Sequence, residues 1–196
     1  MGKVIGIAGS ARKTGNSTTL LQAVLRGAAA SGMETQVVYL NGLTFKGCQG
    51  CEKCSTTGKC ILNDDLTPVL EELKAADGWV LASPIYYDGI NGQLKLFFDR
   101  CRTFTKDPQT QARKPQLPGK KQGFVLLAYA DRARADYLRE AEKLAKYLGW
   151  MCDFGQVEIR VEGEMTARDA MAKRADLLTW AEQRGAALFG NLAARK

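Results

Sequence analysis

The sequence contains no histidine among its 196 residues. Histidine is the commonest general base and the commonest nitrogen ligand of metals, so its absence excludes Ser-His-Asp catalysis and a histidine-ligated zinc site. The chain also lacks an apolar run of the roughly 18–20 residues that a membrane-spanning helix needs. The apolar stretch that ends at Ala8 is too short for the core of a signal peptide. We therefore expect a cytoplasmic protein with no membrane partner.

The chain carries a formal net charge of +7. This excess indicates either an anionic partner, such as a phosphate-bearing cofactor or an acidic electron carrier, or a solvated basic surface. Its densest basic stretch, residues 113–121, contains two prolines and no aromatic residue. Because surfaces that bind nucleic acid combine basic with aromatic side chains, this stretch is more typical of an exposed loop. We expect no nucleic-acid partner.

Short apolar runs alternate with longer amphipathic segments, without an internal repeat. The runs predict strands at residues 4–8, 35–40, 78–83 and 122–128 and within 150–161. The segments between them predict helices at residues 17–31, 64–76, 91–103, 133–148 and 167–189. Pro84 directly follows the third run, and we expect it to end that strand. The alternation predicts a single α/β domain over residues 1–196, a doubly wound five-stranded parallel sheet with helices on both faces. Residues 41–63 interrupt it as a glycine- and cysteine-rich loop.

The loop after the first predicted strand, residues 9–18, combines glycines with short polar and basic side chains. Backbone N–H groups at a helix N-terminus attract anions, and the guanidinium of Arg12 suits a phosphate. The loop is not a nucleotide P-loop, because Asn16 stands where the P-loop has lysine. It is not the dinucleotide fingerprint either, because the spacing of its glycines does not match. The alternative is an ordinary polar turn. Ligands of open α/β sheets bind beyond the carboxyl ends of the strands, which favours an anion site here.

Three segments resemble the NADPH-dependent FMN reductase branch of the flavodoxin-like proteins: Gly9-Ser10-x-Arg12-x-x-Gly15-Asn16-Ser17, Ser83-Pro84-Ile85-Tyr86-Tyr87 and Asn91-Gly92-Gln93-Leu94-Lys95-x-Phe97-x-Asp99-Arg100. The resemblance covers residues 1–102. It implies a flavodoxin-like strand order of 2-1-3-4-5 and FMN as the cofactor. The FMN phosphate would be held by Ser10, Arg12, Asn16, Ser17 and Thr18. The isoalloxazine ring would be lined by Pro84, Ile85, Tyr86, Tyr87 and Ala128.

The tyrosines of the second segment offer flat faces and polar tips that suit a flavin ring, and the alternative is that they only close the sheet edge. After the fourth strand the family usually has small residues and glycines. This chain instead reads Tyr129-Ala130-Asp131-Arg132-Ala133-Arg134. The added tyrosine and the alternating charges could reshape the pocket of the ring or block a nicotinamide, which affects the choice of electron donor more than the flavin itself.

Four cysteines lie within thirteen residues, at Cys48, Cys51, Cys54 and Cys60. In a cytosolic protein such spacing favours metal binding over disulfides. The first three follow the C-x2-C-x2-C run typical of a 4Fe–4S cluster, whereas closed zinc sites more often use two separated C-x2-C pairs. From the residues alone, a cluster, a zinc ion and metal-free or disulfide-bonded cysteines stay open. The motif's position after the second strand resembles the iron–sulfur flavoproteins, which implies that these four cysteines are cluster ligands.

These observations predict a flavin-dependent oxidoreductase in which the flavin performs the redox chemistry and no protein acid or base is needed. Electrons would pass from a ferredoxin-like carrier or NAD(P)H, through a 4Fe–4S cluster and FMN, to a small acceptor. One alternative is a cluster-free NAD(P)H:FMN or quinone reductase whose cysteine loop is structural or binds zinc. Another is a non-enzymatic redox-sensing module. The resemblance also implies a homodimer or tetramer.

Overall fold

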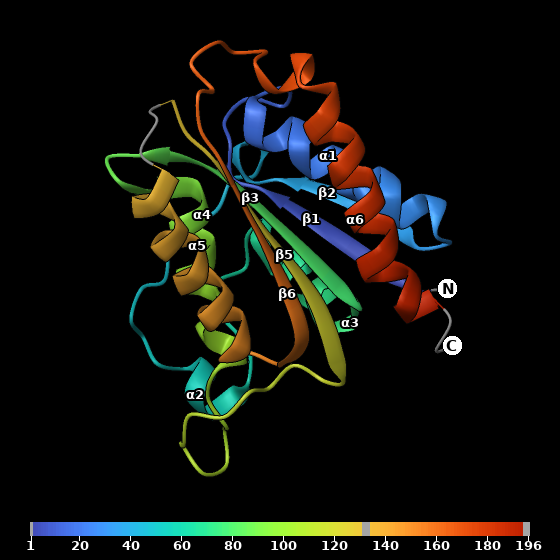
Figure 1. Cartoon of the computed structure of the whole chain (residues 1–196). Helices are drawn as coiled ribbons and strands as arrows, with labels where there is room; N and C mark the ends of the chain where they lie inside the picture. Colours follow the sequence, from blue (N-terminus) through green and yellow to red (C-terminus); the bar gives the residue numbers. More distant parts are fainter. Residues whose placement is uncertain (1, 131–133, 194–196) are drawn as a thin grey trace.

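The computed structural model describes residues 2–130 and 134–193 of the chain. A twisted sheet lies between two layers of helices, with α1 and α6 on one side and α4 and α5 on the other (Figure 1). The strands are β1 (Lys3–Ala8), β2 (Glu34–Tyr39), β3 (Gly78–Tyr86), β4 (Gly89–Ile90), β5 (Lys120–Ala128) and β6 (Asp153–Glu162). The helices are α1 (Asn16–Ala30), α2 (Cys54–Thr57), α3 (Leu66–Ala75), α4 (Gly92–Arg100), α5 (Arg134–Gly149) and α6 (Ala175–Ala193). Short 3-10 turns cover Leu40–Gly42, Cys101–Phe104 and Met171–Lys173.

The five long strands are parallel and follow the order β2-β1-β3-β5-β6. The two-residue strand β4 pairs antiparallel with the end of β3. The short β4 was not predicted, so β5 and β6 correspond to the fourth and fifth predicted strands. With that correspondence, the observed order confirms the expected flavodoxin-like order 2-1-3-4-5. Parallel strands buried on both faces read as continuous apolar runs, which is why the sequence located them.

The sheet has a separate apolar core on each face. Ile5 and Ile7 of β1 point into the core that α3, α4 and α5 cover, while Val4 points into the core beneath α1 and α6. Helices α1 and α6 approach each other closely through glycine. A Cβ atom on Gly27 would lie 1.9 Å from the carbonyl oxygen of Glu182. This contact packs α1, and with it the loop before it, closely against α6.

Several predicted boundaries differ from the structure by a few residues, and two of the differences have a clear structural reason. Strand β3 continues through Pro84, because β1 pairs with β3 only as far as Ala82, and beyond it Pro84 pairs with Ala128 of β5. A strand with one free side accommodates a proline, whose missing N–H can face the unpaired side. The last helix begins at Ala175 and not at residue 167, because the segment before it is bound to α1, as described below. In the described part of the chain, no helix is both long and apolar enough to cross a bilayer.

Candidate functional site

The carboxyl ends of the parallel strands form one edge of the sheet, where several loops are joined by backbone hydrogen bonds. Gly9 N donates to the carbonyl oxygen of Ala82 at 2.8 Å, which ties the loop after β1 to β3. Tyr129 N donates to Glu162 O and Met165 N donates to Tyr129 O, both at 3.0 Å, which ties the loop after β5 to that after β6. The structure therefore brings the three groups of expected flavin ligands, in the loop after β1 and at the ends of β3 and β5, to the same edge.

The loop between β1 and α1 is braced from within. The Ser10 hydroxyl accepts a hydrogen bond from Arg12 N at 3.1 Å. The carbonyl oxygen of Arg12 accepts from Gly15 N and from the Thr18 hydroxyl, each at 3.1 Å. Ser10, Ser17 and Thr18 are buried, whereas the Arg12 side chain is exposed. Of the described residues, no side chain caps the N-terminus of α1, and its first turn has no acidic residue. Its backbone N–H groups and helix dipole therefore remain available to an anion.

Asn16 joins this loop to the segment after β6. Its side-chain Nδ2 donates to the carbonyl oxygens of Met165, at 3.0 Å, and Ala167, at 2.8 Å. Its Oδ1 accepts from the backbone N–H of Met171 at 3.0 Å. Both ends of the amide are thus engaged with backbone groups, and the side chain positions the β1–α1 loop against residues 165–171.

Asn91, which the sequence motif contained but which was not expected to be a site residue, organises the same edge. Its Nδ2 donates to the carbonyl oxygen of Gly9, and its Oδ1 accepts from the buried Ser83 hydroxyl at 3.1 Å and from Leu94 N at 3.4 Å. A Cβ atom on Gly9 would lie 2.8 Å from this Oδ1, so glycine is required there. The signal in the sequence is an asparagine directly before a helix, where such residues cap the first turn.

The turn between β3 and β4 is strained and exposed. Tyr87 and Asp88 have φ angles of 49° and 60°, and left-handed geometry costs a residue other than glycine about 1–2 kcal/mol. Tyr86 is exposed, and Tyr87 is fully exposed at 106%. Asp88 accepts a hydrogen bond from the Tyr137 hydroxyl at 2.7 Å, which links the turn to α5. Backbone strain of this kind concentrates at functional sites, so the turn is a candidate ligand contact.

The extra tyrosine after β5 points inward. Tyr129 is only 5% exposed, and its ring centroid lies 4.7 Å from that of Tyr137. Residues 131–133 of the same loop lie outside the described residues. The Tyr129 ring is therefore part of the packed interior beneath the strained turn.

The four cysteines of the predicted motif line one pocket, although the segment that carries them is irregular apart from the short helix α2. The pocket lining also includes Glu52, Ile61, Asp99, Arg100 and Arg102, with Gln49 and Leu62. Burial raises the pKa of Cys54, Arg102 lowers it, and the other three cysteines raise it further, so the net shift is upward. The thiols are therefore within electrostatic reach of one another. Within residues 2–130 and 134–193, no three Cys, Asp or Glu side chains are close enough to hold a single metal ion.

A buried ion pair fastens the residues on either side of the cysteine segment, which is residues 47–63, to the end of α4. The Arg100 side chain is 0% exposed and that of Asp64 is 15% exposed. Arg100 Nη1 donates to Asp64 Oδ2 at 2.7 Å and to the carbonyl oxygen of Lys46 at 2.8 Å, and Nη2 donates to Asp64 Oδ1 at 3.2 Å. Asp64 also accepts from Lys46 N at 3.1 Å. Burial raises the pKa of Asp64, but the hydrogen bonds and the charge of Arg100 lower it more.

Helix α4 connects the two regions. It starts after Asn91 at the carboxyl edge and ends with Arg100 beside the thiols, a span of about 13 Å for nine residues at about 1.5 Å each. The cysteine segment runs along this helix. A Cβ atom on Gly47 would lie 2.5 Å from Leu96 of α4. The two candidate sites are thus neighbours on one rigid element.

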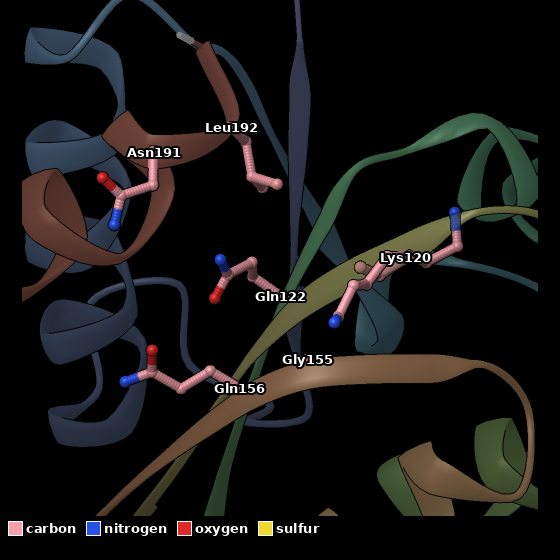
Figure 2. A pocket seen from close by; sticks show the side chains of 7 residues that line it. Lys120, Gln122, Gly155, Gln156, Asn191 and Leu192 are labelled. Carbon is pink, nitrogen blue, oxygen red and sulfur yellow. The ribbon is translucent and has the colours of Figure 1, made fainter. Parts of the chain in front are cut away.

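A second pocket lies at the opposite end of the sheet, away from both regions. Figure 2 shows its lining, from the start of β5, from β6 and from the end of α6: Lys120, Lys121, Gln122, Gly155, Gln156, Asn191 and Leu192. It includes none of the residues expected to bind FMN. In sheets of this type the ligand site is at the carboxyl edge, so this pocket is not the candidate cofactor site.

Fold and site together define a doubly wound α/β protein with an open helix N-terminus at its carboxyl edge and a four-thiol pocket one helix away. The chain belongs to the NADPH-dependent FMN reductase family, whose model matches residues 2–158.

Individual relatives agree with this assignment. An iron–sulfur flavoprotein of Methanocaldococcus jannaschii is 43% identical over 100 residues, which are 51% of this chain and 52% of that protein. An iron–sulfur flavoprotein of Archaeoglobus fulgidus is 33% identical over 125 residues, 64% of this chain and 54% of that one. The chain thus spans about half the length of these curated relatives. The structure of an NAD(P)H:quinone oxidoreductase from Methanothermobacter marburgensis matches 95% of both chains with a TM-score of 0.70 at 19% identity, a likeness of fold.

Proposed function

We propose that the protein is an FMN-dependent oxidoreductase that binds the flavin phosphate at the N-terminus of α1. The observation that carries this proposal is the helix end itself, which no described side chain caps and which faces the carboxyl edge of the sheet. Ser10 and Thr18 shape the loop around that end, and the exposed Arg12 is free to turn its guanidinium toward a bound phosphate. A helix N-terminus with nearby donors and one arginine fits a phosphate dianion.

The residues at the ends of β3 and β5, and in the turn that follows β3, are proposed to line the flavin ring. Register places Pro84 beside Ala128, and the strained turn carries Tyr86 and Tyr87 just beyond them. FMN supplies the redox chemistry when bound, accepting electrons singly or in pairs. The chain's own contribution is to orient the ring and to leave one face open to a donor or acceptor. The proposed electron donors are NAD(P)H and a small ferredoxin-like carrier.

Arg12→Ala tests the phosphate site. We expect FMN binding to weaken by about 1.5–3 kcal/mol, the usual worth of a hydrogen bond to a charged group. Lys13→Ala is the matched control, because Lys13 is the next cation, also exposed, and lies over the Tyr39 ring at 5.4 Å. Fluorescence titration of the flavin-free chain measures both affinities. Equal FMN affinity of the Arg12 variant and the unmodified chain would remove Arg12 from the site.

We further propose that Cys48, Cys51, Cys54 and Cys60 bind a 4Fe–4S cluster. Four thiols that line one pocket provide a suitable donor set, and the first three have the cluster-type spacing. A single zinc ion needs all its sulfur ligands at about 2.3 Å, whereas the four ligands of a cluster bind four separate irons and lie farther apart. Among the described residues no three ligands surround one ion, so the proposal rests on the four thiols that line one pocket and on their spacing along the chain.

Metal analysis of the anaerobically purified and reconstituted chain tests this second part. We expect about four iron and four sulfide per chain, as the cluster requires. Cys60→Ser should lose most of both, while Cys152→Ala, a cysteine buried elsewhere, should keep them. A chain that binds zinc, or FMN without any metal, would instead support a cluster-free reductase with a structural cysteine segment.

The electron donor is distinguished by turnover. Steady-state oxidation of NAD(P)H with a quinone supports a reductase that takes hydride directly. Reduction by a ferredoxin-like carrier without NAD(P)H oxidation supports entry of electrons through the cysteine pocket. If neither NAD(P)H nor the carrier supports turnover, the enzymatic role is contradicted.

A further inference from the structure

Arg100 carries a buried donor that the protein itself leaves unused. Its two terminal nitrogens are occupied by Asp64 and by the carbonyl oxygen of Lys46. Its Nε is buried and has no hydrogen-bond partner among the described residues. A buried N–H group without an acceptor is costly, so it indicates either strain or an absent ligand.

The unused donor borders the four-thiol pocket. Arg100 is one of the residues that line this pocket together with Cys48, Cys51, Cys54 and Cys60. Burial lowers the pKa of Arg100, whereas Asp64 and the neighbouring Cys60 raise it, each through its charge and through its side-chain contact with the guanidinium, and the net shift is upward. Cys60 therefore lies next to the guanidinium. A fully buried positive charge, with one N–H group that has no acceptor, thus borders the pocket where negative sulfur atoms would gather.

We propose that Arg100 is a positioning residue for the centre in this pocket: its Nε–H and its fixed charge act on the bound sulfur atoms and make the centre easier to reduce. This inference rests on the proposed cluster. Hydrogen bonds to sulfur and local charge are the factors that set the reduction potentials of such centres. Reduction adds one negative charge, which a nearby buried cation stabilises.

Arg102 provides a matched comparison. It also lines the pocket, but its side chain is 41% exposed, and its Nη2 pairs with the exposed carboxylate of Glu52 at 3.1 Å. Solvent and the Glu52 charge screen it, so its effect on a centre in the pocket should be smaller. The two arginines therefore separate the effect of a buried charge from that of an exposed one.

The test is a redox titration of the reconstituted chain with dithionite, which supplies one electron per centre and is followed by electron paramagnetic resonance. We expect Arg100→Gln to lower the equilibrium constant for reduction by on the order of tenfold, about 59 mV toward negative potential for one electron. Arg102→Gln should shift it less. Arg100→Lys, which keeps the charge but not the fork, should lie between the unmodified chain and Arg100→Gln. Equal potentials of Arg100→Gln and Arg102→Gln would overturn the inference.

Arg100→Gln also leaves Asp64 without its partner, so an effect on folding has to be separated from the effect on the reduction potential. The comparison is therefore repeated in an Asp64→Asn background, where no carboxylate is left unpaired. There, adding Arg100→Gln should again lower the potential relative to Asp64→Asn alone. An unchanged potential in that background would show that Arg100 acts only through the structure of the segment.

Cobalt(II) distinguishes failure of this inference from failure of the proposed cluster. If the unmodified chain holds no iron or sulfide, the cluster proposal fails, and the cobalt–thiolate absorption band then measures binding at the same four thiols. Weaker cobalt binding by Arg100→Gln than by Arg102→Gln would retain the role of Arg100 at the thiolates. Equal cobalt affinities, or no cobalt binding by the unmodified chain, would overturn it.

Discussion

Asp64→Ala removes the carboxylate that pairs with Arg100, whose guanidinium is not reached by solvent. Asp64 accepts two hydrogen bonds from Arg100, and it also accepts from the backbone N–H groups of Lys46 and Leu66. Removing one partner of a buried ion pair costs about 3–5 kcal/mol, because the remaining charge is uncompensated. We expect a loss of this size in the free energy of unfolding of the cofactor-free chain.

Asp65→Ala is the matched control. Asp65 is the next residue, is exposed, and accepts a hydrogen bond from Thr44 N at 2.8 Å. Losing one such bond costs about 1 kcal/mol. With an m-value of about 2 kcal/mol/M, the two variants should differ in urea midpoint by roughly 1–2 M. Equal midpoints for the two variants would refute the argument that burial of Arg100 makes this pair different.

The same ion pair predicts a dependence on pH. The folded-state pKa of Asp64 is lowered, so its contribution is fully present above its unfolded pKa and is lost as the pH falls through the lower folded value. The stability difference between the unmodified chain and Asp64→Asn should therefore be constant at neutral pH and shrink below about pH 4. A difference that shrinks between pH 6 and pH 8 would assign it to another group.

Two further predictions concern packing and thiol reactivity. Gly27→Ala should lower the free energy of unfolding by about 1–3 kcal/mol or more, because the added methyl group meets the Glu182 carbonyl oxygen. Gly92→Ala is the control: open space surrounds this position, so urea unfolding should show a neutral or stabilising effect. Burial raises the pKa of Cys101 far above its usual value, so alkylation of the metal-free native chain should modify the exposed Cys48 first. Early modification of Cys101 would contradict its burial in the turn after α4.

Local features of the sequence were sufficient for the order of strands and helices. Each long strand is covered on both faces and therefore appears as an apolar run, and right-handed crossovers leave few ways to connect them. The four cysteines were also recognisable, because thirteen residues of chain cannot separate them far. The predicted end of β3 at Pro84 failed, because whether a proline is tolerated depends on the neighbouring strand, which only the sheet reveals.

The roles of individual side chains depended on contacts between distant residues. Asn16 binds backbone groups about 150 positions away, Arg100 meets a carboxylate 36 positions away, and Asn91 reaches Gly9 across 82 positions. No local pattern encodes such distances, because they follow from how the helices pack on the sheet. The sequence by itself determined the α/β class, the loop after β1 and the thiol cluster. The tertiary structure alone decided that one short helix joins the two candidate sites and that its last residue, the buried Arg100, borders the thiols.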